Sequence, residues 1–199
     1  MNFQVQSGEF HTLDQLVKSI DNIPRKHSTL LIGIDGCGGS GKSTLANFLK
    51  EKCSNVTIVH MDDFYFHSDQ IIHEPPTQKP LGADCDWKRV LNQVVDPICQ
   101  NQNGYYQRFD WETDQLAEWH TVPIGGTVIV EGVYSTRNEL SSLYDFTIWV
   151  DCPRETRLLR GIERDGGEAR GMWEDNWMIS EEMYMKEHRP HNRSDLVVG

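Results

Sequence analysis

The stretch Gly36-Cys37-Gly38-Gly39-Ser40-Gly41-Lys42-Ser43-Thr44 decides the fold class of this chain. Its first eight residues match the pattern GxxxxGK[ST], a glycine-rich turn whose successive backbone N–H groups point at one phosphate. The pattern carries weight only between a buried strand and a helix. The apolar run 29–34 precedes it, and residues 42–52 follow with apolar positions at helical spacing. The stretch therefore predicts a strand, a phosphate-binding turn and a helix.

Each polar group of this turn has an expected role in holding a nucleoside triphosphate. The backbone N–H groups of residues 36–44 and the positive end of the following helix are expected to cradle the β-phosphate. Lys42 should reach the β- and γ-phosphates, the Ser43 hydroxyl should bind Mg²⁺, and Thr44 lies on the α-phosphate side. ATP and Mg²⁺ are therefore the expected cofactors.

Outward from this turn, strands alternate with helices along the chain. Nearly continuous apolar runs are typical of strands covered by helices on both faces, and they occur at 30–34, 57–60, 127–131 and 146–150. Helical spacing of apolar residues predicts helices over 11–20, 87–100, 154–164 and 172–188. Short strands at 104–109 and 119–122 should form a small flap, about 102–123, and a last strand is expected at 195–198. We predict one α/β domain over 1–199, a three-layer sandwich with a parallel sheet.

Composition limits the classes of partner. At 38% hydrophobic residues, the 199-residue chain can form a core without disulfides or metal staples. Its formal net charge of −11 would repel a nucleic-acid backbone, so a small-molecule partner is expected instead. Neither a membrane-spanning run nor a signal-peptide pattern is visible, so no membrane association is expected. The five cysteines are scattered without a CxxC pair, which favours reduced thiols and a cytoplasmic location. Assembly into a homo-oligomer is compatible with this sequence.

The residues after the second strand favour a kinase. A phosphate-binding turn alone is compatible with GTPase switches, motor-like ATPases and kinases. The sequence has no DxxG after the second strand and no NKxD motif, which argues against a GTPase. Asp62 and Asp63 follow that strand instead. A carboxylate there would face the γ-phosphate and could accept the proton of an attacking hydroxyl. We predict Asp62 as this base, with Asp63 as the alternative.

Two further features are expected to act on the triphosphate. Glu131 ends the apolar strand 127–131, so its carboxylate should project into the site and hold a water on Mg²⁺. After the fourth buried strand come arginines at helical spacing and one beyond a Gly-Gly pair: Arg157, Arg160, Arg164 and Arg170. Such a series is often a solvated stripe. Behind a phosphate-binding turn it is better interpreted as a lid, about 157–172, in which Arg160 and Arg164 act on the transferred phosphoryl.

Four segments together resemble the uridine kinase family of P-loop kinases, which is related to phosphoribulokinase. They are GIDGCGGSGKSTLA, MDDFY, VIVEGVYS and RLLRGIERD. The resemblance covers most of the chain from about residue 30 onward. It implies a P-loop NTPase fold of the nucleoside kinase type and transfer of the γ-phosphate of ATP to a hydroxyl, most simply the 5′-hydroxyl of uridine or cytidine.

The resemblance also implies acceptor-binding residues. Asp84 falls near the position where an acid of this family binds the ribose hydroxyls. The segment 106–111 resembles the nucleoside-facing hairpin, with Phe109 for stacking and Arg108 for a polar contact. Tyr65 and Arg170 complete the expected substrate-binding set. Trp173 and Trp177, four residues apart, are expected to serve packing.

Two alternatives to a pyrimidine nucleoside kinase remain. The same chemistry could serve another small alcohol, such as a ribosylated pyridine, pantothenate or a sugar. A nucleotide-binding regulatory protein that hydrolyses ATP slowly would share the phosphate-binding turn.

Overall fold

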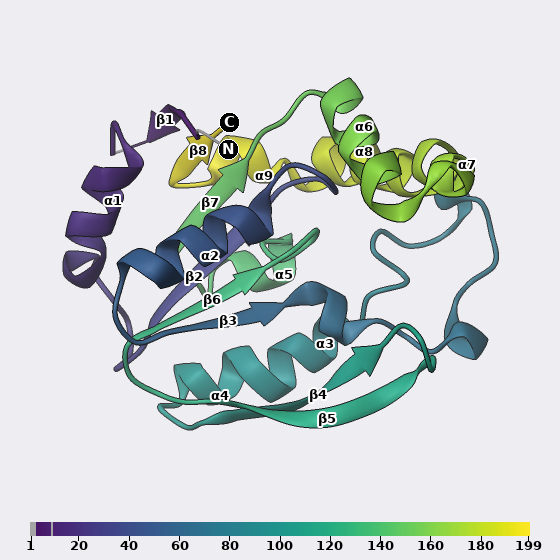
Figure 1. Ribbon diagram of the computed structural model, residues 1–199. Helices are drawn as coiled ribbons and strands as arrows, with labels where there is room; N and C mark the ends of the chain where they lie inside the picture. Colours follow the sequence, from purple (N-terminus) through teal and green to yellow (C-terminus); the bar gives the residue numbers. More distant parts are fainter. Residues whose placement is uncertain (1–2, 9) are drawn as a thin grey trace.

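A six-stranded sheet runs through the computed structural model, which describes residues 3–8 and 10–199 (Figure 1). In spatial order the strands are β1 (Val5–Gly8), β8 (Leu196–Val198), β7 (Phe146–Val150), β2 (Leu30–Asp35), β6 (Thr127–Glu131) and β3 (Val56–His60). Neighbouring strands are parallel from β8 to β3, whereas β1 pairs antiparallel with β8. The carboxyl ends of the parallel strands therefore meet at one edge of the sheet.

Helices cover both faces of the sheet (Figure 1). On one face lie α1 (Leu13–Ser19) and α2 (Lys42–Lys52). On the other lie α5 (Asn138–Ser141) and a longer helix composed of α3 (Trp87–Val90), a π-helical turn (Leu91–Val95) and α4 (Asp96–Cys99). A hairpin of β4 (Gly104–Asp110) and β5 (Gln115–Val122) packs against that longer helix.

The strands are apolar on both sides because each side meets a helical layer. Ile32 of β2 packs in one core with Leu45 of α2. The preceding residue, Leu31, points the other way into the second core with Val94. Since successive side chains of a strand alternate between faces, a strand between two helical layers needs apolar residues throughout.

The C-terminal third of the chain adds helices beside the residues that follow β2. They are α6 (Arg154–Asp165), α7 (Arg170–Met172), a π-helical turn (Trp173–Trp177), α8 (Met178–His188) and α9 (Pro190–Arg193). Trp173 is almost fully buried and packs so closely on α6 that a Cβ atom at Gly161 would overlap its ring. This packing joins α6 to the segment that leads into α8.

The predicted three-layer α/β architecture is confirmed, with two corrections. The sheet is mixed rather than purely parallel, because an N-terminal strand that we did not predict pairs antiparallel at its edge. β1 has mostly exposed residues and no apolar run, so it lacks the pattern by which buried strands are found. The second hairpin strand begins at Gln115, four residues before the predicted start. No helix of the described residues is long and apolar enough to cross a membrane.

Candidate active site

The carboxyl ends of three adjacent strands, β2, β6 and β3, carry the predicted phosphate-handling residues. The glycine-rich turn follows β2, Glu131 ends β6, and Asp62 comes two residues after β3. A cavity of about 720 Å³ opens at this edge and is lined by Lys42, Ser43, Asp62 and Glu131 among others. Residues from three separate parts of the sequence therefore share one cavity.

The glycine-rich turn is held in shape from behind. Gly36 has a φ of +153°, and a Cβ atom there would lie 2.5 Å from the carbonyl oxygen of Val150. The Asp35 carboxylate is fully buried and accepts hydrogen bonds from Gly36 N, from Thr136 N and Oγ1, and from the Tyr184 hydroxyl. These bonds join the start of the turn to the chain after β6 and to α8. None of these partners is among the residues that line the cavity, so Asp35 supports the shape of the turn.

The phosphate-facing part of the turn has the expected polarity. Lys42 is the first residue of α2, and its ammonium donates to the carbonyl oxygen of Cys37 at 3.0 Å. The helical hydrogen bonds of α2 begin at Leu45, whose backbone N–H donates to the carbonyl oxygen of Gly41. The N–H groups of residues 42–44 thus precede the first helical bond and are available to an anion.

Glu131 connects the turn to β3. Its Oε1 atom accepts a hydrogen bond from the Ser43 hydroxyl at 3.0 Å and lies 2.5 Å from Nδ1 of His60. Burial would raise the pKa of Glu131, but the His60 hydrogen bond and the Lys42 charge outweigh it, so this pKa is lowered. The hydrogen bond to Glu131 in turn raises the pKa of His60. Glu131 therefore keeps an ionised carboxylate beside the Ser43 hydroxyl.

Asp62 and Asp63 diverge within a 3₁₀ turn, Met61–Phe64, rather than in an extended segment. Asp62 lines the cavity and is accessible to solvent through it. Desolvation by the surrounding protein raises the pKa of its carboxyl, against the opposing charge of Lys42. Asp63 instead accepts a hydrogen bond from the Tyr106 hydroxyl at 2.9 Å, outside the set of cavity-lining residues.

The two predicted lid arginines reach the cavity from α6. Arg160 Nη1 donates to the carbonyl oxygens of Gly39 at 3.1 Å and Ser40 at 3.4 Å. Arg164 also lines the cavity, and its guanidinium pairs with the neighbouring Asp165. Arg160 thus contacts the backbone of the glycine-rich turn, whereas Arg164 lines the cavity beside Asp165.

At the other end of the cavity, aromatic rings and a carboxylate line the wall. The rings of Tyr65 and Trp111 lie 4.4 Å apart between centroids. Asp84 accepts two hydrogen bonds from the Lys79 ammonium, at 2.8 and 2.9 Å. All four residues line the cavity, together with Tyr134. This end offers flat apolar surface next to hydrogen-bonding groups.

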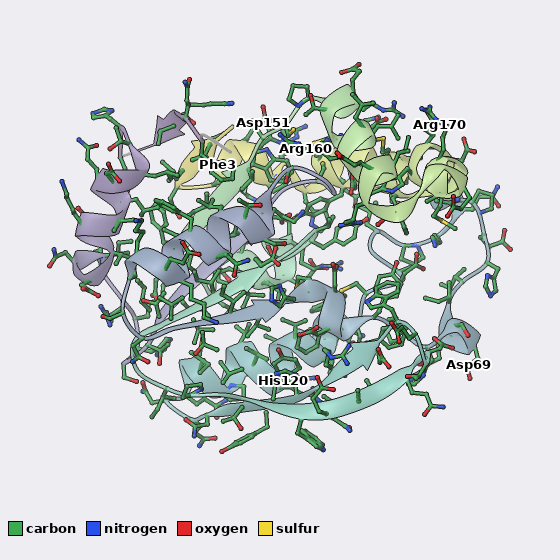
Figure 2. The ribbon with its side chains drawn as sticks, viewed as in Figure 1. Phe3, Asp69, His120, Asp151, Arg160 and Arg170 are labelled. Carbon is green, nitrogen blue, oxygen red and sulfur yellow. The ribbon has the colours of Figure 1, made fainter. Side chains whose placement is uncertain are left out.

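Three predicted substrate-binding residues are not brought to this cavity. Phe109 is 3% exposed and packs behind Tyr65 and Trp111. Arg108 pairs with Glu118 and Asp110 on the hairpin. Arg170 pairs with Glu174 on the surface, and Figure 2 shows it away from Arg160 at the outer end of the helices. Two residues of the glycine-rich turn that were predicted to bind the nucleotide, Gly36 and Ser40, are buried and do not line the cavity.

Several cavity-lining residues were not predicted as site residues. Trp111 stands at the end of the hairpin segment that the sequence singled out, and its residue type was the available signal. Trp173 and Trp177 serve packing, as predicted, but both also line the cavity. Glu181 of α8 lies beside the glycine-rich turn, and no motif marks it. Its contacts depend on the packing of α8, which the sequence pattern does not specify.

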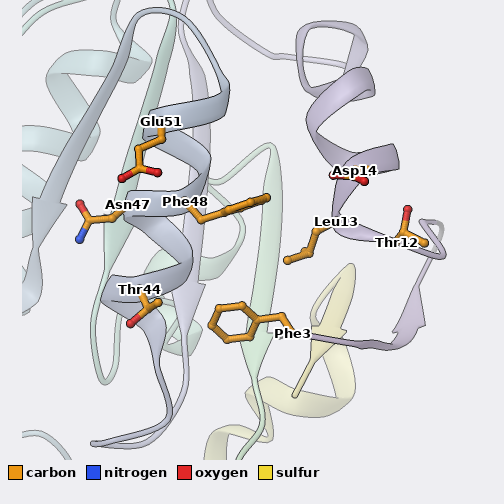
Figure 3. A pocket seen from close by; sticks show the side chains of 8 residues that line it. All are labelled: Phe3, Thr12, Leu13, Asp14, Thr44, Asn47, Phe48 and Glu51. Atoms are coloured by element: carbon orange, nitrogen blue, oxygen red, sulfur yellow. The ribbon is translucent and has the colours of Figure 1, made fainter. Parts of the chain in front are cut away.

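A second, more open groove of about 650 Å³ lies between α1 and α2 (Figure 3). Phe48, Asn47 and Glu51 line it from α2, and Phe3 and Leu13 from the N-terminal segment. Thr44 lines both this groove and the main cavity. The catalytic candidates Lys42 and Asp62 and the metal-site candidate Glu131 all line the main cavity.

Comparison with known proteins places the chain in a family. The phosphoribulokinase / uridine kinase family matches residues 81–189, more than half of the chain. A uridine kinase of Halobacterium salinarum is 24% identical over 181 residues, covering 84% of this chain and 78% of the relative. A nicotinamide riboside kinase of Eremothecium gossypii is 49% identical over 43 residues, which cover 22% of this chain and 18% of that protein.

A solved structure gives the same result for the fold. The structure of a possible uridine kinase from Bacillus stearothermophilus superposes with a TM-score of 0.72 and 26% identity, covering 93% of this chain and 96% of that one. The fold, the glycine-rich turn and these similarities agree. The chain belongs to the phosphoribulokinase / uridine kinase family and is a small-molecule kinase.

Proposed function

We propose that this kinase transfers the γ-phosphate of ATP to the 5′-hydroxyl of a pyrimidine ribonucleoside, uridine or cytidine. One observation carries the proposal: the cavity that contains Lys42 and Asp62 continues without interruption to the ring of Trp111 and the carboxylate of Asp84. A triphosphate at the glycine-rich turn and a nucleoside against Trp111 would then meet at Asp62.

In the proposed reaction, Asp62 accepts the proton of the 5′-hydroxyl as the oxygen attacks the γ-phosphorus. The new O–P bond forms while the bond from phosphorus to the β,γ-bridging oxygen breaks, and ADP leaves with that electron pair. Lys42 stabilises the negative charge on the β- and γ-phosphates, and the turn holds the phosphates in place through its N–H groups. Arg160 and Arg164 add positive charge from the lid side.

The Ser43 hydroxyl and the Glu131 carboxylate fit a magnesium site. Their oxygens are 3.0 Å apart, and Mg²⁺ takes one or two protein oxygens with phosphate oxygens and waters completing its shell. When bound, Mg²⁺ would neutralise charge on the β- and γ-phosphates. The lowered pKa of Glu131 keeps its carboxylate ionised for this role.

Recognition of the acceptor is proposed to rest on stacking and on the ribose hydroxyls. A pyrimidine ring would lie against Trp111 and Tyr65, because flat rings bind aromatic faces at little orientational cost. Asp84 would accept hydrogen bonds from the 2′- and 3′-hydroxyls, and Lys79 fixes its carboxylate. The hairpin would close over the base as a flap.

A second candidate acceptor is a ribosylated pyridine. The short, strong similarity to a nicotinamide riboside kinase favours it. The chemistry of the cavity wall agrees, since a pyridinium cation is attracted both to the faces of Tyr65 and Trp111 and to the carboxylates of Asp62 and Asp84. Pantothenate carries a carboxylate of its own and fits this wall less well.

A coupled assay of ADP release over uridine, cytidine, nicotinamide riboside, pantothenate and simple sugars tests the proposal. We expect the highest kcat/KM for a ribonucleoside, with uridine or cytidine first. A preference for nicotinamide riboside by tenfold or more would select the second candidate. Turnover of pantothenate or a sugar above every riboside would overturn the proposed acceptor class.

Removing the Trp111 ring should weaken acceptor binding selectively. Because aromatic stacking on a base contributes about 1–3 kcal/mol, Trp111→Ala should raise the KM for the best acceptor by about tenfold while the KM for ATP stays unchanged. Trp119→Ala is the matched control, since Trp119 is 64% exposed and does not line the cavity. Steady-state kinetics on both variants measure the difference. Equal KM values for the two variants would exclude stacking on Trp111.

The lid arginines should act on turnover more than on nucleotide affinity. Arg160→Ala and Arg164→Ala are each expected to lower kcat by about tenfold or more, because their charges are used chiefly in the transition state. Arg154→Ala is the control on the same helix, where Arg154 pairs with Glu182 at the surface. The measurement is kcat together with the dissociation constant of ADP. Unchanged kcat in both lid variants would mean that these arginines form only a solvated stripe and do not act in phosphoryl transfer.

A further inference from the structure

A buried carboxylate on α8 contacts the glycine-rich turn directly. Glu181 is 3% exposed, and its Oε1 atom accepts a hydrogen bond from the backbone N–H of Gly38 at 2.7 Å. Its other oxygen, Oε2, accepts from Nη1 of Arg157 at 2.7 Å. Arg157 is 4% exposed and belongs to α6. One carboxylate thus joins three separate elements: the turn, α6 and α8.

Among the N–H groups of residues 36–44 that were expected to cradle phosphate, that of Gly38 is already bonded to Glu181. Those of residues 42–44 precede the first helical hydrogen bond of α2 and stay available. Gly38 lies earlier in the turn, where a Cβ atom would contact Glu181 and the ring of Trp173, each at 3.0 Å. Glu181 therefore holds the turn at Gly38 and leaves the N–H groups at the N-terminus of α2 available to an anion.

Arg157 carries the restraint into the lid helix. Its carbonyl oxygen lies so close to Gly39 that a Cβ atom there would be 2.7 Å away, and Gly39 has a φ of +74° that favours glycine. Arg157 Nε also donates to the carbonyl oxygen of Cys152. One helical turn further along, Arg160 donates to the carbonyl oxygen of Gly39. These contacts fix the orientation of α6 relative to the turn.

We propose that Glu181 is a positioning residue: through its ion pair with Arg157 it locks α6 to the glycine-rich turn and so aims Arg160 at the transferred phosphoryl group. The proposal rests on the phosphoryl-transfer role of the lid given above. Glu181 itself does not touch the reacting atoms. Because Arg160 acts in the transition state, Glu181 is expected to stabilise the transition state and to leave the ground-state affinity for the nucleotide unchanged.

Binding of a phosphoryl mimic separates these two states without any acceptor. Mg²⁺–ADP measures ground-state binding, and Mg²⁺–ADP with aluminium fluoride imitates the phosphoryl group in transfer. Tryptophan fluorescence can follow both titrations, since Trp173 lies against Gly38. In Glu181→Gln we expect the ADP dissociation constant to change by less than about threefold, while the extra affinity gained with aluminium fluoride falls by about tenfold. An unchanged fluoride increment would overturn the proposal.

Controls distinguish positioning from general support of the fold. Glu182→Gln changes the same residue type one position along α8, in an exposed pair with Arg154, and should alter neither constant. If Glu181→Gln does not fold because Arg157 is left buried without a partner, the double variant Arg157→Met with Glu181→Leu removes both charges together. That double variant should fold and still lose the fluoride increment. Retention of the increment there would refute the proposal as well.

Coupling to Arg160 is the second test. If Glu181 acts through Arg160, Glu181→Gln should change the fluoride increment by less than about twofold in an Arg160→Ala background, whereas independent effects would multiply. Multiplicative losses would overturn the route through Arg160. Since neither titration contains an acceptor, failure of the proposed uridine or cytidine acceptor would leave these results unaffected, and loss of all fluoride-dependent binding in the wild type would instead contradict the proposed transfer site.

Discussion

Lys42→Ala is expected to abolish phosphoryl transfer. The substitution removes the one ammonium that the glycine-rich turn carries, whose place is at the β- and γ-phosphates. Because losses of a single charge or donor at a transferring phosphoryl commonly cost 10²–10⁵ in rate, we expect kcat to fall by at least about 10³-fold. Single-turnover transfer from radiolabelled ATP to the best acceptor gives the required sensitivity.

The fold should survive this substitution. Lys42 is mostly buried, but its ammonium donates a hydrogen bond to the carbonyl oxygen of Cys37 and fills no apolar core. Lys50→Ala, an exposed position on the same helix, is the control and should retain full turnover. If Lys42→Ala showed native circular dichroism and wild-type turnover, the glycine-rich turn would not be part of the catalytic site.

The placement of the candidate phosphate-handling residues was predictable because their geometry is local. A strand, a glycine-rich turn and a helix follow one another in sequence, so the position of Lys42 and Ser43 depends on a few consecutive residues. Glu131 ends β6 and Asp62 follows the neighbouring parallel strand β3, and parallel strands place their carboxyl ends at one edge. Apolar runs were enough to locate those strands.

The acceptor half was less predictable because it depends on how the hairpin packs against other segments. Phe109 of β4 is 3% exposed, packs against the rings of Tyr65 and Trp111, and does not line the cavity. The family resemblance assigned Phe109 to stacking, but the contact with Tyr65 joins residues far apart in the sequence and is not visible in the pattern of apolar residues. Trp111, two residues further along the chain, lines the cavity instead.

Contacts between distant helices were beyond the sequence for a different reason. Arg157 and Glu181 meet through the packing of α6 against α8, whose relative placement follows from buried rings such as Trp173. Helical spacing made the arginines of α6 visible as a series. It did not reveal that Arg157 is bound internally while Arg160 reaches the glycine-rich turn.

Asp62→Asn should leave ATP binding intact and slow transfer by roughly 10²–10⁴-fold, the usual effect of losing a general base. The amide keeps the size and much of the hydrogen bonding of the carboxylate but cannot take the proton of the attacking hydroxyl. Desolvation raises the pKa of Asp62, so the wild-type kcat/KM should fall as pH decreases through a value above the usual ~4 of an aspartate. That acid limb should disappear in Asp62→Asn, because the group that titrates there is gone.

Asp63→Asn is the matched control for this experiment. Its carboxylate accepts the Tyr106 hydroxyl, a bond that the amide oxygen of asparagine can also accept, so we expect less than about a threefold change in kcat. The measurement is a pair of single-turnover assays at saturating ATP across the pH range, with nucleotide binding measured on each variant. If Asp63→Asn were the crippled variant, the base would be Asp63 and the 3₁₀ turn would have to rearrange when substrate binds. If neither variant slowed transfer and the acid limb persisted in both, neither of these carboxylates would be the base, and Glu131, a cavity-lining carboxylate that interacts with Lys42, would be tested next.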